Sequence, residues 1–534
     1  MIIRSLASLC ALLCLFTAAR AQPPVDASQL LELHRRAMKP VYELFASSPV
    51  RVDYLKGNPA DDNRISFHWQ GGKFRQEYHW LGFTEVFGFD GSDNWYGSDL
   101  DMPYSLDRGN GLDITEELAC NFAYLSPGAE GELSVPESVP LGLGEKYAVL
   151  KFAPPGMSEA LLLLDKENYR LAGLLQGSDG RLEDTVLYSL TTFEQWQDFG
   201  PGWYPAVLRT KTLSLEGEQI RERVMETQSV AMAEPLPAEM FSRQSSPPVA
   251  QPALPTVPYE MPFSFLTDTV VLPCTGPDGK AMRLEFDTGA SVGLLRRDVV
   301  RRLGLKPVGK EFVSGHGGSA SVSYVRVEGV RLPGGVELPA WPAAVLQNGK
   351  EGTGLEESLA GNSVAGLLGN FVLSHFVVQL DYRRRRVLMW PPASFDPARD
   401  LSPGYIAIPC KRASMPYVDV TVDGKLKGGA FFNTGAQQFF TLEAWAVEQA
   451  GLDYELERIG TGVTVKGFTV FGIIEPGEVR INGLTIEKPL THLELLAPGE
   501  VPDPHSIASF GNEFFQRYKV TFDLYHEMYY IEKM

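Results

Sequence analysis

The chain has 534 residues, with 48 basic and 66 acidic side chains and a formal net charge of −18. This length is too great for one hydrophobic core, so we expect about three folding units. The composition is 44% hydrophobic and 21% charged, which argues against general disorder, and the dispersed negative charge disfavours nucleic acid as a partner.

The N-terminus has the pattern of a secretory signal peptide. Arg4 precedes a short apolar run from Leu6 to Ala19, and Ala-Arg-Ala at residues 19–21 suits cleavage before Gln22. The run is too short to span a bilayer comfortably, and no later apolar stretch is long enough. We expect residues 1–21 to be removed and the protein to be exported, either periplasmic or secreted, with no transmembrane segment.

Removal of the signal peptide leaves three cysteines, Cys120, Cys274 and Cys410. Because this number is odd, at least one thiol is free or pairs between chains. An oxidising compartment permits a Cys274–Cys410 disulfide, but the sequence leaves the pairing open. The histidines are scattered and no Cys/His spacing resembles a metal site. We therefore predict no metal and no cofactor.

Residues 22–233 predict a first domain with a helix packed on a curved antiparallel sheet. The helix is expected over residues 27–45. Aromatic-rich strands then alternate with turns, including one at Gly71-Gly72, and a second hairpin signal has its turn at residues 166–168. This pattern is typical of an antiparallel meander.

Over residues 26–232 this domain resembles the periplasmic lipoprotein-carrier family. The resemblance rests on the export signal, the leading helix, the turn "GFDGSDNWYG" and the stretch "LLLLDKENYRLAGL". It implies an open half-barrel that holds acyl chains, and hence a lipid or acyl ligand. The alternative is that the aromatic side chains fill an ordinary core, and the sequence leaves both interpretations open.

The next segment, residues 234–262, is crowded with Pro and also carries Ser and Gln. Proline fixes φ and removes a backbone donor, so this segment is expected to be an extended linker.

After the linker the chain repeats itself. "RLEFDTGAS", with its acid at Asp287, is answered by "GGAFFNTGAQ", with an amide at Asn433, and "GLLGN" is answered by "ASFGN". The interval from Asp287 to Gly369 is 82 residues (369 − 287), and that from Asn433 to Gly511 is 78 (511 − 433). Two anchors in the same order at near-equal spacing indicate duplicated lobes. The predicted lobes are residues 263–400 and 401–534.

Each lobe has an apolar strand that runs into Asp-Thr-Gly or Asn-Thr-Gly, then an apolar pair followed by Gly, a strand and a hairpin. This order resembles the retropepsin and pepsin families of aspartic proteases over nearly the whole of each lobe. The resemblance implies a mainly β fold in which two loops meet at a pseudo-two-fold axis and bind a peptide. It assigns Asp287 and Asn433 to the catalytic positions. The loop residues are Thr288, Gly289, Ala290, Thr434, Gly435 and Ala436, and the residues behind them are Leu368, Gly369, Phe510 and Gly511.

The same resemblance implies flap hairpins over the cleft. In the first lobe these glycines and one histidine fit: Gly315, His316, Gly317 and Gly318. In the second lobe the counterpart is Gly467. His316 could contact a ligand, although a loop histidine is more often simply solvated.

The departure from these families lies at Asn433. In the families, two close carboxyls share one proton, and the ionised one activates a water while the other protonates the scissile carbonyl. An amide keeps the size and can donate a hydrogen bond, but it cannot exchange the proton. Within one chain, Asp287 and Asn433 therefore predict severely impaired hydrolysis.

Three functional hypotheses follow. In the first, the lobes pair within one chain and bind peptides or protein termini without cutting them. In the second, two chains bring two Asp287 side chains together and form an active aspartic endopeptidase. In the third, the N-terminal domain carries the function by binding a lipid or lipoprotein. The first is favoured, because a duplication within one chain makes intrachain pairing the simplest geometry.

Overall fold

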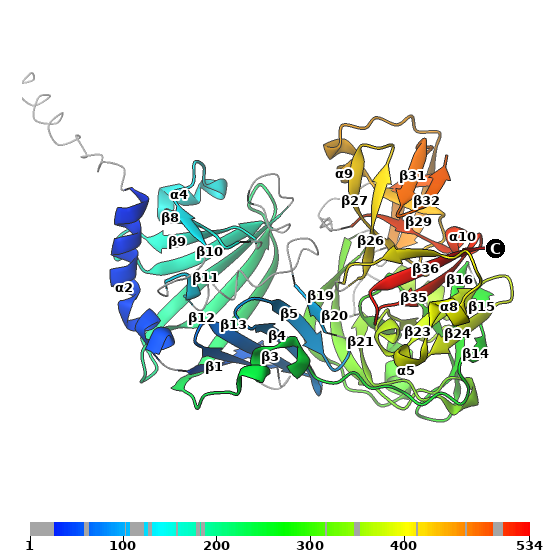
Figure 1. Cartoon of the computed structure of the whole chain (residues 1–534), viewed down its shortest axis with the longest axis horizontal. Coiled ribbons are helices and arrows are strands. Elements are labelled where there is room, and N and C mark those ends of the chain that lie inside the picture. Colours follow the sequence, from blue (N-terminus) through cyan, green and yellow to red (C-terminus); the bar gives the residue numbers. More distant parts are fainter. Residues whose placement is uncertain are drawn as a thin grey trace, which may run out of the picture.

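The computed structural model describes residues 26–47, 49–57, 63–101, 103–106, 122–125, 131–155, 158–177, 182, 187–266, 268–315, 318–346, 353–412, 415–464, 467–494 and 506–534. The fold is mainly β, as predicted, and the strands form four sheets. Figure 1 shows two bodies side by side, one with the N-terminal sheet and the other with the remaining three. Within the described part of the chain, no helix is both long and apolar enough to cross a membrane.

The first element is helix α2 (Ala27–Ser47), close to the helix expected over residues 27–45. At its N-terminus the Asp26 carboxylate accepts the Gln29 N–H at 2.7 Å, which satisfies one of the donors that a helix leaves unpaired there. Leu30 and Phe45 are buried against the N-terminal sheet. The helix therefore docks through one apolar face.

The N-terminal sheet has 13 strands in the order β6-β5-β4-β3-β2-β1-β13-β12-β11-β10-β9-β8-β7. The strands are β1 (Val50–Lys56), β2 (Arg64–Gln70), β3 (Lys73–Trp80), β4 (Phe83–Phe89), β5 (Asn94–Ser98), β6 (Tyr104–Ser105), β7 (Glu132–Ser134), β8 (Tyr147–Ala153), β9 (Ala160–Asp165), β10 (Leu171–Gly177), β11 (Tyr188–Asp198), β12 (Trp203–Leu213) and β13 (Gln219–Met232). Three short helices accompany them: η3 (Ala123–Leu125), η4 (Pro140–Gly142) and α4 (Leu143–Lys146).

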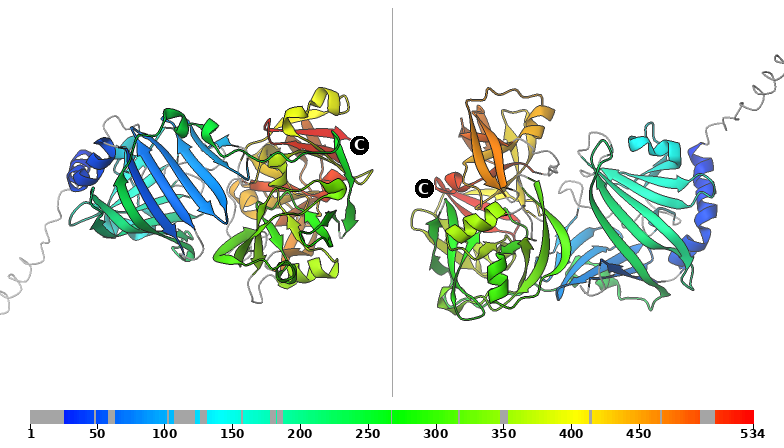
Figure 2. Two further views of the ribbon diagram at one scale, coloured as in Figure 1. Left: turned by 90° about the horizontal axis from the view of Figure 1, so that it is seen from below. Right: turned by 180° about the vertical axis from the view of Figure 1, so that it is seen from behind.

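This sheet consists of two antiparallel meanders that join where β1 pairs with β13. The predicted turns are present, since Gly71-Gly72 joins β2 to β3 and residues 166–168 lie between β9 and β10. The sheet is curved (Figure 2). Strands β6 and β7 stand at opposite ends of its strand order. A helix packed on a curved antiparallel sheet is thus confirmed.

Aromatic side chains from this sheet, from helix α2 and from the residue before η3 pack together. Phe122 is 1% exposed, and its ring centroid lies 6.0 Å from those of both Phe45 and Tyr204 and 6.1 Å from that of Trp196. Contacts of this kind stabilise a core through both buried area and ring geometry. These aromatic residues form a packed core.

The Pro-rich segment is in contact with both bodies. Its short helices η5 (Ala238–Phe241) and η6 (Arg243–Ser245) lie on the N-terminal sheet, where the Trp95 indole N–H donates to the Phe241 carbonyl at 2.8 Å. Its last residues form β14 (Tyr259–Pro262), which pairs with β24 (Arg386–Trp390) of the second body. The segment therefore joins the bodies and also packs on each.

Two sheets of the second body repeat one strand plan. The eight-stranded sheet has the order β15-β16-β17-β22-β18-β21-β20-β19 and the nine-stranded sheet the order β29-β30-β33-β28-β34-β27-β26-β31-β32. The first contains β15 (Ser264–Leu266), β16 (Thr269–Thr275), β17 (Ala281–Phe286), β18 (Gly293–Leu295), β19 (Val308–Gly315), β20 (Gly318–Val327), β21 (Trp341–Leu346) and β22 (Gly366–Leu368). The second contains β26 (Tyr417–Val422), β27 (Leu426–Phe432), β28 (Phe440–Glu443), β29 (Arg458–Thr464), β30 (Gly467–Ile474), β31 (Glu478–Ile481), β32 (Leu484–Glu487), β33 (Thr491–Glu494) and β34 (Ser506–Phe510).

The repetition extends to strand direction. β17 pairs in parallel with β22, and β27 pairs in the same way with β34. β18 pairs antiparallel with β22, and β28 pairs in the same way with β34. β18 also pairs in parallel with β21, as β28 does with β33. The helices of this body are short: α5 (Arg297–Arg302), η7 (Pro333–Gly335), α6 (Thr353–Gly361), α7 (Val372–His375), η8 (Pro392–Ser394), α8 (Pro397–Asp400), α9 (Ala444–Gln449) and α10 (Asn512–Phe515).

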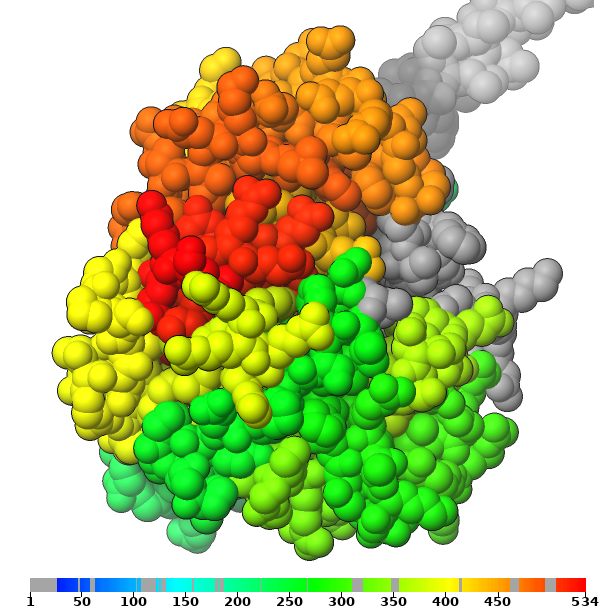
Figure 3. Space-filling model, turned by 90° about the vertical axis from the view of Figure 1, so that its right-hand side faces the viewer, coloured from blue at the N-terminus to red at the C-terminus, as the bar shows by residue number. Residues whose placement is uncertain are grey.

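A six-stranded sheet, in the order β14-β24-β23-β35-β36-β25, joins the two repeats. The hairpin of β23 (Val377–Asp381) and β24 follows the eight-stranded sheet in the chain, whereas β35 (Tyr518–Asp523) and β36 (Met528–Lys533) follow the nine-stranded one; β25 (Ile406–Pro409) lies at the edge. At the centre, Gln379 faces Thr521, and its amide donates to the Thr521 hydroxyl at 2.8 Å. Both repeats also share one apolar core. In Figure 3 the C-terminal segment, coloured red, lies between orange residues above it and yellow and green residues below it.

The two bodies meet through the β3–β4 turn and through Asp101. The Arg326 guanidinium, on β20, donates to the carbonyls of Leu81 and Gly82 at 3.1 and 3.2 Å. The Asp101 carboxylate accepts hydrogen bonds from Ser374, in α7, and from Arg412, which follows β25. One carboxylate of the N-terminal body thus binds a residue from each half of the second body, Ser374 in the first and Arg412 in the second.

Cys274 and Cys410 are both buried and free. Burial raises the pKa of each thiol to about 12, so both remain protonated and unreactive at ordinary pH. The structure therefore gives no Cys274–Cys410 disulfide, and Cys120 lies outside the described residues.

Candidate active site

The site is built from two loops, the Asp287 loop (residues 287–290) and the Asn433 loop (residues 433–436). Each begins where a buried strand ends, β17 in one case and β27 in the other. The Asp287 N–H donates to the Leu368 carbonyl at 3.0 Å, and the Asn433 N–H donates to the Phe510 carbonyl at 2.7 Å. The predicted supporting residues therefore lie directly behind the loops.

Gly369 and Gly511 allow this close approach. A Cβ atom on Gly369 would lie 2.7 Å from the Ala290 carbonyl oxygen, and one on Gly511 would lie 2.7 Å from the Ala436 carbonyl oxygen. Atoms that are not bonded do not approach so closely, so any side chain would push the loop forward. The backbone N–H groups of Asn370 and Asn512 donate to those same carbonyls at 2.8 Å.

A reciprocal set of hydrogen bonds between Thr288 and Thr434 connects the two loops. Each backbone N–H donates to the other threonine's hydroxyl at 3.0 Å. The Thr288 hydroxyl donates to the Phe432 carbonyl at 2.6 Å, and the Thr434 hydroxyl donates to the Phe286 carbonyl. Both threonines are buried, with 4% and 0% of their surface exposed. The two threonines therefore couple the Asp287 loop to the Asn433 loop.

Asp287 and Asn433 lie at equivalent places on the two loops. The Gly289 N–H donates to Asp287 Oδ1 at 2.9 Å, and the Gly435 N–H donates to Asn433 Oδ1 at 2.8 Å. A Cβ atom on Gly435 would lie 2.5 Å from the Asp287 Cγ, and one on Gly289 would lie 2.4 Å from the Asn433 Cγ. Each side chain thus packs against the glycine of the opposite loop, within a single chain.

The chemistry of the two positions differs although their geometry matches. A carboxylate only accepts hydrogen bonds and can take up a proton, whereas an amide offers two N–H donors that it does not release. With Oδ1 of Asn433 bonded to Gly435, the remaining polar atom of the amide is its donor nitrogen. The pair can therefore polarise a carbonyl and activate a water, but it lacks a shared proton.

Glu285, which the sequence reading missed, is a second acid near Asp287. Burial and then the charge of Asp287 raise the pKa of Glu285 to about 8, although a hydrogen bond with Thr269 acts in the opposite direction. The stretch "RLEFDTG" could have indicated this acid, because the even-numbered residues of the strand are apolar and the acids at 285 and 287 both belong to the other face.

The predicted flap glycines lie on two hairpins. Gly315 faces Gly318 at the end of the β19–β20 hairpin, and Gly467 faces Thr464 at the end of the β29–β30 hairpin. The remaining flap residues, His316 and Gly317, lie outside the described residues. Helix α6, from the chain of the eight-stranded sheet, contacts both β29 and β30. The second hairpin thus reaches across to the first repeat.

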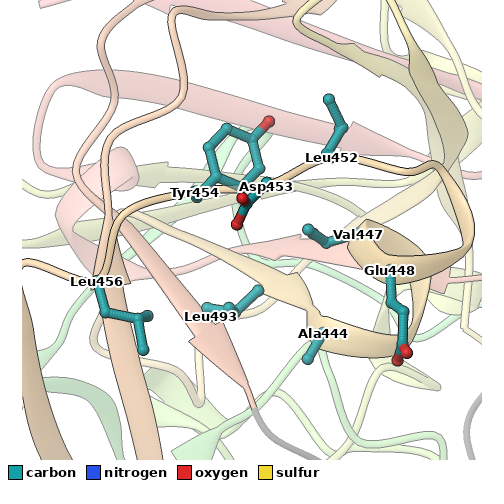
Figure 4. Close-up of a pocket in the computed structure, with 8 residues that line it drawn as sticks. All are labelled: Ala444, Val447, Glu448, Leu452, Asp453, Tyr454, Leu456 and Leu493. Atoms are coloured by element: carbon teal, nitrogen blue, oxygen red, sulfur yellow. The ribbon is translucent and has the colours of Figure 1, made fainter.

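A pocket of about 390 Å³ lies elsewhere, beside α9. Figure 4 shows Val447 and Glu448 of α9 around it, together with Tyr454 and with Leu493 of β33. None of the predicted site residues lines this pocket. Over the residues that the structure describes, no group of three or more His, Cys, Asp or Glu side chains could hold a metal ion.

Comparison with protein families gives a match for the segment around Asp287. Residues 273–371 match the family model described as Aspartyl protease. This segment includes the Asp287 loop together with Leu368 and Gly369. No curated protein matches the chain. Residues 273–371 therefore form an aspartic-protease-like domain, in agreement with the resemblance that the Asp-Thr-Gly motif and its supporting glycine indicated.

Proposed function

We propose that the Asp287 and Asn433 loops form the floor of one peptide-binding cleft, and that this cleft hydrolyses peptides at a severely reduced rate. The observation that carries the proposal is the packing of Asp287 on Gly435 and of Asn433 on Gly289. In the aspartic-protease family the two catalytic acids occupy these two places. The protein then retains the binding geometry and lacks one of the acids.

The expected loss of rate follows from proton transfer. Asp287 can accept a proton from water, and the Asn433 amide can donate a hydrogen bond to the carbonyl oxygen of a peptide. No group at position 433 can protonate that oxygen or the departing amine. Positioned proton transfer contributes about 10²–10⁴ in rate, so hydrolysis is expected to be slower by about that factor than at a site with two acids.

Pairing of two Asp287 side chains from two chains is the alternative route to activity. It would require the Asp287 loop to give up its contacts with the Asn433 loop, including the hydrogen bonds between Thr288 and Thr434. It would also separate β23 from β35 in the six-stranded sheet. These contacts favour pairing within one chain.

We also propose that the protein acts outside the cytoplasm, on the basis of the signal pattern in residues 1–21. The mature N-terminus checks this directly. Mass spectrometry of the protein from an extracytoplasmic fraction should find Gln22 as the first residue. Intact protein with Met1, found only in the cytoplasm, would contradict export.

Binding without efficient cleavage is tested with pepstatin, a statine-containing peptide that engages the catalytic acids of aspartic proteases. Isothermal titration calorimetry of the full chain at acidic pH should detect binding, and Asp287→Ala should abolish it. A matched control is Asp419→Ala, which removes an exposed acid that pairs with Lys411 on the surface. Absence of pepstatin binding by the wild-type chain would refute the proposed cleft.

A further inference from the structure

Glu285 lies on the same strand face as Asp287. Its neighbours Leu284 and Phe286 are fully buried in the core that the two repeats share. Successive side chains of a strand point to opposite faces, so Glu285 projects away from that core. Asp287, two residues further on, projects towards Gly435 of the opposite loop.

This face of the eight-stranded sheet is turned towards the second repeat. Across the strands, Glu285 pairs with Val271 on β16 and with Leu367 on β22. Val271 and Leu367 belong to an apolar cluster on this face that includes Leu359 of α6. Since α6 in turn contacts β29 and β30 of the nine-stranded sheet, the face that carries Glu285 borders the space between the repeats.

The duplication provides a comparison for this position. The residue two positions before Asn433 is Phe431, which is 6% exposed and pairs with Tyr417 and Ser509. The strand plan therefore accepts an apolar residue here. An acid among apolar neighbours is expensive to keep ionised, and such groups gather at functional sites. The acid at Glu285 is thus not a requirement of the fold.

We infer that Glu285 determines which side chain the cleft accepts beside Asp287, and that it selects a basic side chain, lysine or arginine. This inference rests on the proposed peptide-binding function and names its ligand class. A cation next to Asp287 and Glu285 would compensate two carboxylates in a partly buried site, where opposite charges attract more strongly than in water. At the equivalent position of the second repeat, Phe431 is aromatic and uncharged.

Proton linkage gives this inference a distinct signature. In the free protein the Glu285 pKa is about 8, because burial and the Asp287 charge favour the neutral acid. A bound cation would lower that pKa, so binding releases a proton near pH 7 and tightens as the pH rises towards 9. An uncharged side chain of the same shape would further disfavour the ionised acid, so its binding weakens as the pH rises.

The experiment uses two statine-type peptides that differ only in the side chain next to the hydroxyl-bearing carbon, aminobutyl in one and butyl in the other. Calorimetric titration of the full chain at pH 6, 7.5 and 9, in buffers of different ionisation enthalpy, measures affinity and proton release. At pH 9 the aminobutyl peptide should bind at least about tenfold more tightly, as expected for a charged hydrogen bond of this kind. Glu285→Gln should reduce the preference to about twofold or less.

The outcomes separate this inference from the function on which it rests. Equal binding of both peptides, or a preference that persists in Glu285→Gln, would overturn the inference and leave the peptide cleft intact. Failure of both peptides to bind at any pH would overturn both. If Glu285→Gln does not fold, the affinities of the two peptides for the wild-type chain still test the inference. They should change in opposite directions as the pH rises, and a change in the same direction would contradict a role for Glu285.

Discussion

The Asp287 and Asn433 loops make equivalent hydrogen bonds and differ in their chemistry. Both have a threonine bonded to the opposite loop, a glycine under the opposite side chain, and an alanine whose carbonyl meets a glycine behind it. They differ at two positions. The acid Asp287 corresponds to the amide Asn433, and two residues earlier the acid Glu285 corresponds to Phe431. The residues that hold the loops together are thus duplicated, whereas those that carry charge are present only in the first repeat.

The largest effect on stability is expected from breaking the hydrogen bonds that connect the two loops. Thr434→Ala removes the donor to the Phe286 carbonyl and the acceptor of the Thr288 N–H, and leaves both buried groups without those hydrogen bonds. An unsatisfied buried group costs about 1–3 kcal/mol, so the free energy of unfolding should fall by about 2–5 kcal/mol. Urea unfolding of the full chain measures this change.

Thr434→Ser is the matched control, because it keeps the hydroxyl and should stay within about 1 kcal/mol of the wild type. Hydrogen exchange followed by mass spectrometry should also show faster exchange in both loops of Thr434→Ala. Faster exchange in the Asn433 loop alone would show that the loops are not coupled.

A smaller effect on stability, which depends on pH, is expected at Glu285, the position where the second repeat has Phe431. The pKa of Glu285 is raised from 4.5 to about 8 by folding, so the protonated acid stabilises the native state. That stability is present at low pH and is lost as the pH rises from about 4.5 through 8. Each pKa unit corresponds to about 1.4 kcal/mol. Between pH 5 and 9 the wild type should therefore lose about 2–4 kcal/mol relative to Glu285→Gln.

The measurement is urea unfolding of both proteins at pH 5, 7 and 9, with the difference between them plotted against pH. A difference that does not vary with pH would show that Glu285 has no raised pKa. Phe431, at the equivalent position, carries no titratable group, so Phe431→Leu should change stability by the same amount at every pH.

The smallest effect is expected at the junction with the N-terminal body. Asp101→Ala leaves Arg412, whose side chain is 3% exposed, without its carboxylate partner. Breaking a buried ion pair costs about 3–5 kcal/mol, but Asp101 is 23% exposed, so we expect about 1–3 kcal/mol. Asp419→Ala, which breaks an exposed pair with Lys411, should change stability by about 0.5 kcal/mol or less.

Proteolysis of the Pro-rich segment reports the same junction, since its short helices lie on the N-terminal sheet. Asp101→Ala should be cut faster within residues 234–262 than Asp419→Ala. Equal cleavage rates would show that Asp101 does not hold the bodies together.

Much of the candidate site was predictable because its residues belong to two short motifs that each occur twice in the chain. The spacing of Asp287 to Gly369 and of Asn433 to Gly511 identified both loops and the elements behind them. The hydrogen bonds between Thr288 and Thr434 were not predictable in detail, because they join residues 146 positions apart. Periodicity likewise predicted the helix and hairpins of the N-terminal sheet.

Other features depended on tertiary packing. The parity of Glu285 with Asp287 was visible, but only the burial of Phe286 shows which strand face meets the opposite loop. The contact of Asp101 with Arg412 joins residues 311 positions apart and has no local signal. The packing of the Pro-rich segment on the N-terminal sheet had no local signal, because several of its contacts use backbone carbonyls, as at Phe241, that any sequence has.

Hydrolysis of an unfolded protein at acidic pH tests the central claim most directly. Wild type, Asn433→Asp and Asp287→Ala are compared by the rate at which each cleaves reduced, alkylated casein, with pepstatin as inhibitor. Restoring the second acid should raise the rate by about 10²–10⁴, in a pepstatin-sensitive manner, over a wild type that scarcely exceeds Asp287→Ala. Efficient, pepstatin-sensitive cleavage by the wild type that is lost in Asp287→Ala and unchanged in Asn433→Asp would contradict the account.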